Sequence, residues 1–309
     1  MNRQGGFVLV VVLLVVALLT GLTVTFINDV YLETGSRSAS LDAAQGSLFA
    51  EGGIAAGLQL LSVTVGSASY STLNDLWAQP LQLQEEQGQL LVTITEESGK
   101  LNFNQVVLPN GTAHPVFHPL AQRLLKRLTL LPDLLDAASD WIDEGDIPSP
   151  GGAEKDWYLA QKQPLQPRNG PLETVEELGR VKGFANGPLE QLLPFITVYG
   201  EASVGAPATK ININTAPQEL LEALDERITA ALATRIIAWR RLTPFKEPSD
   251  LARVPGMDGI APSLLTAITA KGSVYRLISA ATVNGTTRTI EAVVRLSGST
   301  PTVLYWREY

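Results

Sequence analysis

An uncharged apolar run opens the chain. From Phe7 to Ile27 no residue is charged, and Val, Leu and Ala dominate. At about 1.5 Å per residue, a helix of this length crosses a hydrocarbon core of roughly 30 Å. Arg3 precedes the run, and Asp29 and Glu33 follow it. The positive-inside tendency therefore predicts a cytoplasmic amino end, with the bulk of the chain on the other side of the membrane.

A cleaved secretory signal peptide is the alternative interpretation of this run. Such peptides have an apolar region of about 7–15 residues and end in a small-residue site of the A-x-A type. The run here is longer and stops at Asn28 and Asp29 without such a site. We therefore expect a transmembrane helix over 7–27 that stays attached to the chain.

Apolar residues recur at helical spacing after the run. They stand three, four and seven positions apart, at Leu41, Ala44, Leu48, Ala55, Leu58 and Leu61. This spacing predicts that the helix continues over 28–62 with an apolar stripe. The stripe needs a covering surface.

Strand patterns near both ends of the remaining chain predict that surface. Tyr275–Val283 and Thr287–Leu296 flank Asn284-Gly285, a dipeptide that favours tight type I′ turns. Gln89–Thr95 is rich in Leu, Val and Ile. We expect an α+β fold in which the long helix packs on an antiparallel sheet formed by 63–104 and 272–309.

Helical patterns broken by Pro and Gly lie between the strands and predict an inserted helical domain over 105–271. A strand at Phe195–Tyr199 would divide this domain, and its membership of the main sheet stays open. The predicted helices are Leu120–Leu131, Leu134–Ile142, Val175–Arg180, Leu189–Leu193, Gln218–Leu224, Ile228–Trp239 and Ser263–Ile268.

Composition narrows the function. The chain has 309 residues, a net charge of -8, no cysteine and two histidines. An acidic chain is poorly suited to a dominant role in nucleic-acid binding, because that affinity rests largely on Lys and Arg. The lack of cysteine leaves the redox compartment open.

A membrane-anchored enzyme has little support in the sequence. His114 and His118 have the spacing of a zinc pair, but Pro115 and Pro119 disfavour the helix that would place both on one face. The chain has no G-x-S-x-G elbow, H-E-x-x-H motif or P-loop. We therefore predict a protein that is not an enzyme and has no catalytic residues.

The junction between the polar head, M-N-R-Q-G-G, and the apolar run, F-V-L-V-V-V, resembles that of type IV prepilins. Their short basic leader ends in glycine and is removed by a membrane peptidase that also N-methylates the new terminus. The resemblance implies that 1–6 is a leader, that cleavage follows Gly6, and that Phe7 becomes the N-methylated terminus. An ordinary uncleaved anchor is the alternative.

Val11 departs from the pattern of major pilins. They have a glutamate at the fifth mature position, which would be position 11 here. An intramembrane carboxylate is costly unless it is paired, and a subunit with nothing above it in a filament has no partner for that charge. Val11 therefore fits a subunit at the filament tip, and it fits a plain anchor equally well.

Two motifs inside the helical region extend the resemblance. The first is D-W-I-D-E-G-D-I-P-S-P-G-G-A-E over 140–154, followed by R-N-G-P over 168–171 and E-E-L-G-R-V-K-G-F over 176–184; the second is K-I-N-I-N-T-A-P over 210–217. With the leader, Val11 and the terminal hairpin, they resemble the GspK family, the large minor pseudopilin of type II secretion systems.

The resemblance implies a location and partners. The location is the bacterial inner membrane, with the bulk of the chain in the periplasm, at the tip of a short pseudopilus that serves protein export. The implied partners are other minor pseudopilins in a hetero-oligomeric tip complex, the prepilin peptidase and methyltransferase, and the inner-membrane assembly platform.

The second motif has a structural interpretation. Thr215 can act as an N-cap with Pro217 near the first turn of the following helix. Asn212 and Asn214 can satisfy backbone groups in the preceding turn. We expect these four residues to shape the chain rather than bind a ligand.

Carboxylates concentrate around the first motif, with seven between Asp136 and Asp156. Oxygen-rich clusters suit calcium, and calcium is a cofactor associated with the GspK family, although the spacing is not that of an EF-hand loop. The best candidate ligands are Asp140, Asp143, Asp146 and Glu154. A solvated acidic surface is the alternative.

The main rival interpretation concerns the second half of the insert. From Lys210 onward the sequence resembles a tandem helix-hairpin-helix (SAM-like) module of the DNA-uptake type, with the V-P-G-M hairpin over 254–257. However, the first hairpin reads L-D-E-R-I-T where a Gly-rich turn is needed, and seven basic residues balance seven acidic ones over 210–259. A membrane-anchored DNA-binding protein of the competence type is therefore the alternative function, with a poor electrostatic footprint for DNA.

Overall fold

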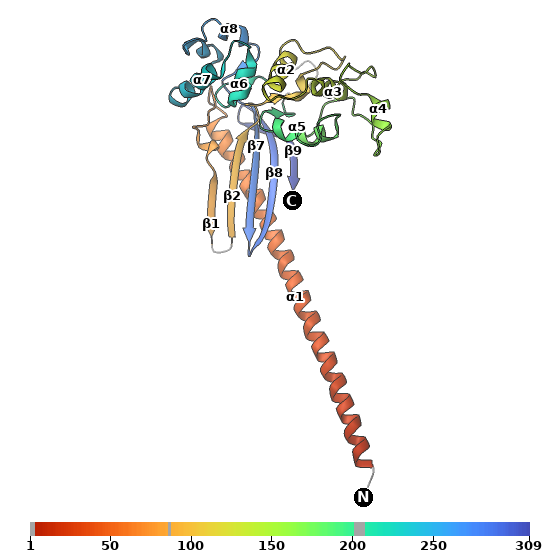
Figure 1. Cartoon of the computed structure of the whole chain (residues 1–309). Helices are drawn as coiled ribbons and strands as arrows, with labels where there is room; N and C mark the ends of the chain where they lie inside the picture. The colour runs from red at the N-terminus through yellow and green to blue at the C-terminus, as the bar shows by residue number, and fades with distance from the viewer. Residues whose placement is uncertain (1–3, 86–87, 201–207) are drawn as a thin grey trace.

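One helix dominates the shape of the molecule. The structure is a computed structural model, and it describes residues 4–85, 88–200 and 208–309. Helix α1, Gln4–Thr64, is continuous from the apolar run into the head of the protein, and its 61 residues make it about 90 Å long. Figure 1 shows its amino-terminal part extending alone below the rest of the chain. Residues 1–3 of the expected leader lie outside the described residues.

A five-stranded antiparallel sheet packs on the carboxyl-terminal half of α1. Its strand order is β1-β2-β7-β8-β9. The strands are β1 (Leu81–Glu85), β2 (Gly88–Glu96), β7 (Val274–Val283), β8 (Thr286–Ser297) and β9 (Thr300–Glu308). The predicted strand at Gln89–Thr95 and the predicted terminal hairpin are confirmed, and each strand end agrees to within one residue.

The turn between β7 and β8 has the expected geometry. Asn284 and Gly285 have φ of 45° and 85°, the left-handed pair that a type I′ turn requires. The turn fixes the register, so that Leu277 pairs with Ala292 and Tyr275 pairs with Val294. These four side chains therefore share the face that α1 covers.

Close approach of α1 to the sheet depends on glycine. A Cβ at Gly53 would collide with Ser279 Oγ and lie 2.9 Å from Val92 Cγ2, while one at Gly57 would lie 2.7 Å from Leu277 Cδ2. These glycines let the helix backbone settle onto β2 and β7. The core between helix and sheet also contains Ala50, Ile54, Leu61, Val65, Trp77, Val92, Ile94, Ile290 and Ala292.

The predicted apolar stripe on α1 divides between two faces. Leu61 is fully buried against the sheet and Leu58 is partly buried, as expected. Leu41 and Leu48 are instead 71% and 67% exposed. The expectation that the sheet covers the whole stripe is wrong, because the heptad spacing of Leu41, Leu48 and Ala55 runs along the side of α1 that faces away from it.

We call the exposed part of α1 over 7–41 the stem. The helical insert sits on the end of the sheet opposite the stem (Figure 1). Its core is continuous with the far face of the sheet, since Val274 and Val293 belong to it. The α-helices of the insert are α2 (Phe117–Arg127), α3 (Asp133–Ile142), α4 (Lys155–Leu159), α5 (Pro188–Leu192), α6 (Gln218–Leu224), α7 (Ala230–Leu242) and α8 (Ala261–Leu264).

Short elements complete the insert. The pair β3 (Leu101–Asn102) and β4 (Ile196–Thr197) is parallel, as is the pair β5 (Ile211–Asn212) and β6 (Ile268–Thr269). The predicted strand at 195–199 is therefore β4, outside the main sheet. The 3₁₀ helices are η1 (Leu76–Ala78), η2 (Phe103–Gln105), η3 (Val175–Arg180) and η4 (Pro248–Arg253).

Candidate functional site

The stem of α1 is exposed along its apolar length. Phe7, the expected mature terminus, is 72% exposed, and Val11 and Leu18 are also exposed. Within the described residues, α1 is the one helix long and apolar enough to cross a membrane. Gly6 and Phe7 both lie in the first turns of this helix. Cleavage between them stays a prediction.

Three of the four candidate calcium ligands are buried close to one another. Asp140 lies in the last turn of α3, Asp143 directly follows that helix, and Glu154 directly precedes α4. All three are less than a tenth exposed. Asp146, in the connecting loop, is exposed. The first sequence motif therefore folds back so that its two ends meet.

Backbone amides hold two of these carboxylates. Ser149 N donates to both oxygens of Asp140, at 3.2 and 3.0 Å, and Gly145 N donates to Asp143 Oδ1 at 2.7 Å. Gly152 is required because a Cβ there would collide with Asp140 Oδ2. The glycines of the motif therefore allow the chain to wrap tightly around these oxygens.

Glu154 has a different environment. Both of its carboxylate oxygens are buried and have no hydrogen-bond partner. Burial raises the pKa of Glu154 to about 7, and the charges of Asp140, Asp143 and Asp146 add to that effect. Burial and Asp140 also raise the pKa of Asp143, against the hydrogen bond from Gly145. The cluster is thus a concentration of negative charge without a described counter-charge.

This cluster fits a hard cation by its chemistry. Its donors are oxygens, as calcium prefers, and the orphaned Glu154 carboxylate is buried at a cost that a cation would offset. Among the described residues, however, no group of three or more His, Cys, Asp or Glu is arranged to hold a metal ion. The donor set is therefore suitable, but its side chains are not assembled as a coordination sphere.

The other stretches of the first motif hold this part of the insert together. Glu177 Oε1 accepts from Trp141 Nε1 at 3.0 Å and lies 3.8 Å from Arg168 Nη1. Lys182 Nζ donates to the carbonyls of Gly151 and Gly152 at 3.1 and 2.7 Å. The segments over 140–154, 168–171 and 176–184 are thus one packed unit.

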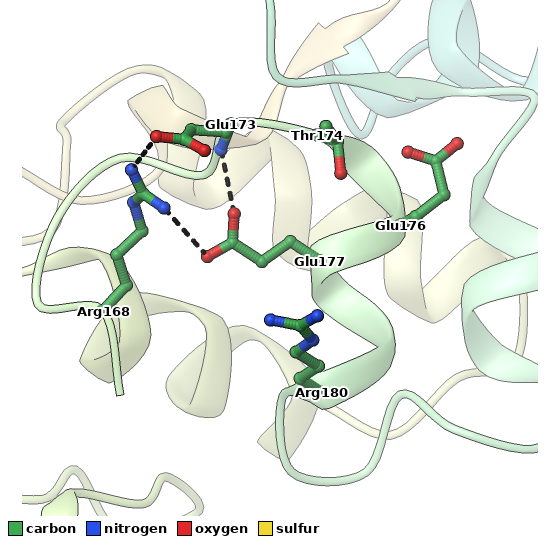
Figure 2. A pocket seen from close by; sticks show the side chains of 6 residues that line it. All are labelled: Arg168, Glu173, Thr174, Glu176, Glu177 and Arg180. Atoms are coloured by element: carbon green, nitrogen blue, oxygen red, sulfur yellow. Dashed lines mark hydrogen bonds and ion pairs between the residues drawn. The ribbon is translucent and has the colours of Figure 1, made fainter. Parts of the chain in front are cut away.

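A polar cavity of about 270 Å³ lies beside this unit. Figure 2 shows Arg168 directed at Glu173 and Glu177, with Arg180 below Glu177 and Glu176 further to the right; all of them line the cavity. Glu173 N also donates to Glu177 Oε2 at 3.0 Å. Most of the polar atoms around Glu177 therefore satisfy one another, and we assign the cavity no ligand.

The second motif lies at the junction of the insert and the sheet. Asn212 Nδ2 donates to the two oxygens of Glu96 at 2.9 and 3.1 Å and to Ser71 Oγ at 3.0 Å. Asn214 joins two loops, because its Nδ2 donates to the carbonyls of Phe245 and Ala270. Asn212 Oδ1 accepts from Asn214 N at 3.0 Å. Asn212 thus satisfies a backbone group of the preceding turn as expected, whereas the backbone partners of Asn214 lie in two distant loops.

Thr215 does not cap a helix. Helix α6 begins at Gln218, with Pro217 as the residue before it. Thr215 Oγ1 instead donates to Glu96 Oε1 at 3.1 Å. The N-cap prediction is therefore wrong, because α6 begins three residues after Thr215, with Pro217 at the cap position.

Glu96 and Arg240 are central to this junction, and the sequence reasoning did not identify either. Arg240 Nη1 donates to the carbonyls of Ile213 and Ala216 at 2.7 and 2.8 Å. Glu96 ends β2, where no local pattern marks it, and its partners Asn212 and Thr215 lie more than a hundred positions away. The sole available signal was a carboxylate at the end of an otherwise apolar strand pattern.

The two histidines serve local structure. His114 Nδ1 accepts from Val116 N at 3.1 Å, and His118 Nδ1 lies 3.2 Å from Val106 O. Burial lowers the pKa of His114. Both Nδ1 atoms therefore have backbone partners.

The possible DNA-binding module is packed into the insert. Arg123 of α2 donates to the carbonyls of Ala223 and Leu224, at the end of α6. At the second hairpin, Gly256 has φ of 94°, and Arg235 Nη1 donates to Pro255 O at 2.6 Å. These arginines cap hairpin carbonyls instead of presenting free cations, so the DNA-binding alternative is not favoured.

Comparisons with known proteins agree with this architecture. Two family models described as type II secretion system (T2SS), protein K match residues 99–201 and 211–271, together more than half of the chain. A type II secretion system protein K of Pectobacterium carotovorum subsp. carotovorum is 26% identical over 227 residues, which cover 69% of this chain and 67% of that protein. A putative type II secretion system protein K of Escherichia coli (strain K12) is also 26% identical, over 69% of this chain and 66% of that protein.

The fold also matches a solved structure. A chain in the crystal structure of the GspK-GspI-GspJ complex from the enterotoxigenic Escherichia coli type 2 secretion system superposes with a TM-score of 0.75 at 24% identity. The match covers 90% of this chain and 99% of that one. The long helix, the antiparallel sheet and the helical insertion are thus shared, and the chain belongs to the type II secretion system protein K family of minor pseudopilins.

Proposed function

We propose that this chain caps the tip of a periplasmic pseudopilus and helps to initiate its assembly for protein export. It is cleaved between Gly6 and Phe7, and α1 anchors it in the bacterial inner membrane with its amino end in the cytoplasm. The prepilin peptidase, which also methylates Phe7, and the inner-membrane assembly platform act on it. Its role is structural and not enzymatic.

The position of the insert supports a place for this chain at the tip of the filament. The insert occupies the end of the sheet that is opposite the stem (Figure 1). A pilin-like subunit added above would need that space, while subunits below can still pack along the exposed stem. Val11 agrees with this arrangement, because it gives the stem no carboxylate to pair with the terminal amine of a neighbour above.

The matched structure supports the choice of partners. That structure is named as a complex of GspK with GspI and GspJ. We infer by analogy that this chain forms a hetero-oligomeric complex with other minor pseudopilins of its own secretion system. The apolar residues of the stem, which nothing in the described part of the chain covers, then have helices or lipid against them.

Calcium is the proposed cofactor of the insert. Asp140, Asp143, Asp146 and Glu154 would hold the ion, which would supply the positive charge that the buried carboxylates lack. Binding would order the segment between α3 and α4. The ion would stabilise the insert, because the cluster lies at α3 and α4 within it (Figure 1).

A charge in the middle of the stem tests the proposed function. Val16→Arg places a cation at the centre of the expected span, at a cost of about 2.5–3.5 kcal/mol for membrane insertion. Export of a substrate of the same system should fall sharply, and the chain should leave the membrane fraction. Ser40→Arg, on an exposed position of α1 beyond the span, is the matched control and should leave both unchanged. Normal export with Val16→Arg would refute the proposal.

A further inference from the structure

Helix α1 covers the middle of one sheet face and leaves one edge of that face open. It packs mainly on β7 and β8 and less on β2. Trp306 pairs with Ala292 and Val303 pairs with Val294, so each pair shares a side of the sheet. Ala292 and Val294 are fully buried beneath α1, whereas Trp306 and Val303 are 46% and 52% exposed. The side chains on this face are therefore buried on β8 but exposed on the neighbouring strand β9.

The residues of β9 on this side form a continuous strip, which we call the β9 flank. Its members are Pro301, Val303, Trp306 and Glu308, whose pairing partners on β8 lie in the core beneath α1. All four are exposed. The flank thus continues the apolar face that binds α1, but nothing in the described chain covers it.

The width of the sheet explains the uncovered strip. Five strands at about 4.8 Å spacing separate the outer strand axes by about 19 Å. One helix with its side chains is about 10 Å wide. A sheet of this width accommodates a second helix beside α1, and the described residues place only one α-helix, α1, on this face.

Acidic groups border the β9 flank. Ser47 Oγ of α1 donates to Glu308 Oε1, which places this side of α1 against the flank. Glu51 lies one turn further along the same side and is exposed. Neither glutamate has an ion pair within the described part of the chain. A helix that lies there would bind more favourably with a Lys or Arg placed next to Glu51 and Glu308.

The flank is better suited to a helix on its face than to a strand on its edge. Pro301 lacks an N–H, and a register irregularity opposite Val293 and Val294 interrupts the ladder of β9. Both features are typical of edge strands that do not accept a further strand. Exposed Trp306 instead offers the kind of aromatic anchor that is enriched in protein interfaces.

We propose that the stem helix of a neighbouring pilin-like subunit lies beside α1 on the β9 flank, with an apolar face over Trp306 and Val303 and a basic residue near Glu51 and Glu308. This inference rests on the proposed function, because two chains anchored in one membrane hold their stems roughly parallel. That is the direction a helix needs in order to lie next to α1 on this face.

The opposite edge of the same sheet face provides a matched control. Leu81 and Leu83 of β1 pair with Val92 and Leu90, and they are 37% and 55% exposed. They too lie beyond the reach of α1. They lack an aromatic anchor, and Glu51 and Glu308 lie on the other side of the helix.

Site-specific photo-crosslinking tests the inference in cells that contain the complete secretion system. A photoreactive amino acid replaces Trp306 or, as the control, Leu83 in the full-length chain. Position 306 should give an adduct whose crosslinked peptide comes from the stem helix of another pilin-like subunit, and position 83 should give at least tenfold less. An adduct with a strand peptide at 306, or a stem adduct at 83 alone, would overturn the inference.

Exchange of single side chains separates this inference from the proposed function. Trp306→Ala and Glu51→Lys should each lower co-purification of the partner subunits at least tenfold, whereas Leu83→Ala should not. Unchanged thermal unfolding would show that these variants are folded. If the complex co-purifies normally with Trp306→Ala and Glu51→Lys, the β9 flank is not the interface. If the wild-type chain has no pilin-like partner, the proposed function itself fails, and the flank inference fails with it.

Discussion

The amide of Asn212 donates hydrogen bonds to both carboxylate oxygens of Glu96, which joins the first residues of the second motif to the end of β2. Ser71 and Thr215 donate to the same carboxylate. Glu96 and Asn212 are both buried. This contact connects the helical insert to the sheet.

Removal of the Asn212 amide should destabilise the protein. Asn212→Ala removes one of the three donors to the buried Glu96 carboxylate and leaves the buried Asn214 N–H without its acceptor, so we expect a loss of roughly 2–4 kcal/mol in the free energy of unfolding. Denaturant unfolding of the detergent-solubilised full chain measures this loss. Asn110→Ala, at an exposed asparagine that accepts one hydrogen bond from Thr112 N, should cost less than about 1 kcal/mol. Equal losses would show that the junction contributes nothing special.

Glu96 should make stability depend on pH. Burial raises its pKa from 4.5 to about 7, against the opposing hydrogen bonds of Asn212, Ser71 and Thr215. The folded chain thus binds this proton more tightly than the unfolded chain does. Its contribution is complete below pH 4.5 and is lost as the pH rises through about 7, with a total on the order of 3 kcal/mol.

Glu96→Gln isolates that contribution. The free energy of unfolding of wild type minus that of Glu96→Gln should fall between about pH 4.5 and 7. Glu154, whose pKa is also raised to about 7, is present in both proteins, so its contribution cancels in this difference. A difference that stays constant over this range would contradict the assignment of the proton to Glu96.

Two adjacent glycines on α1 should respond oppositely to a methyl group. Gly53→Ala pushes a Cβ into Ser279 and Val92, whereas nothing lies within 4 Å of a Cβ at Gly52. We expect Gly53→Ala to cost about 1–3 kcal/mol and Gly52→Ala to be neutral or to stabilise by up to about 1 kcal/mol, because Ala favours a helix. Thermal unfolding of the two variants provides the comparison, and equal effects would contradict the close packing of α1 on the sheet.

Calcium should stabilise the insert. Addition of the ion in millimolar excess should raise the unfolding temperature, and a chelator should reverse the rise, because a ligand that binds the folded state selectively shifts the equilibrium. Glu154→Gln should abolish the response, while magnesium should have little effect. Glu154→Gln should also be at least as stable as wild type in the chelator, since it removes a buried charge that lacks a partner. An undiminished calcium response in Glu154→Gln would exclude the cluster as the site.

Local patterns predicted local structure well. Helix α6 begins and ends where its leucine pattern does, and the turn at Asn284-Gly285 has the expected positive φ values. The segment over 175–180 was predicted as a helix, but it forms 3₁₀ turns. It contains Gly179, and glycine disfavours the interior of an α-helix.

Contacts between distant segments were not predictable in the same way. Strand β9 was missed because Pro301 and its mixture of polar and aromatic residues obscure the alternation. Glu96 became part of the site through partners on other elements, and Leu41 and Leu48 proved exposed because helical spacing does not reveal which face a sheet covers. Exposed apolar residues such as these indicate contacts with molecules other than this chain.

The mass of the mature protein tests the central claim most directly. Intact mass and amino-terminal sequencing of the chain from cells with the prepilin peptidase should give an N-methylated Phe7 terminus, and cells without the peptidase should give the unprocessed chain. A Met1 terminus in both would contradict the account, because the stem would then be an ordinary anchor and not the processed helix of a pseudopilin.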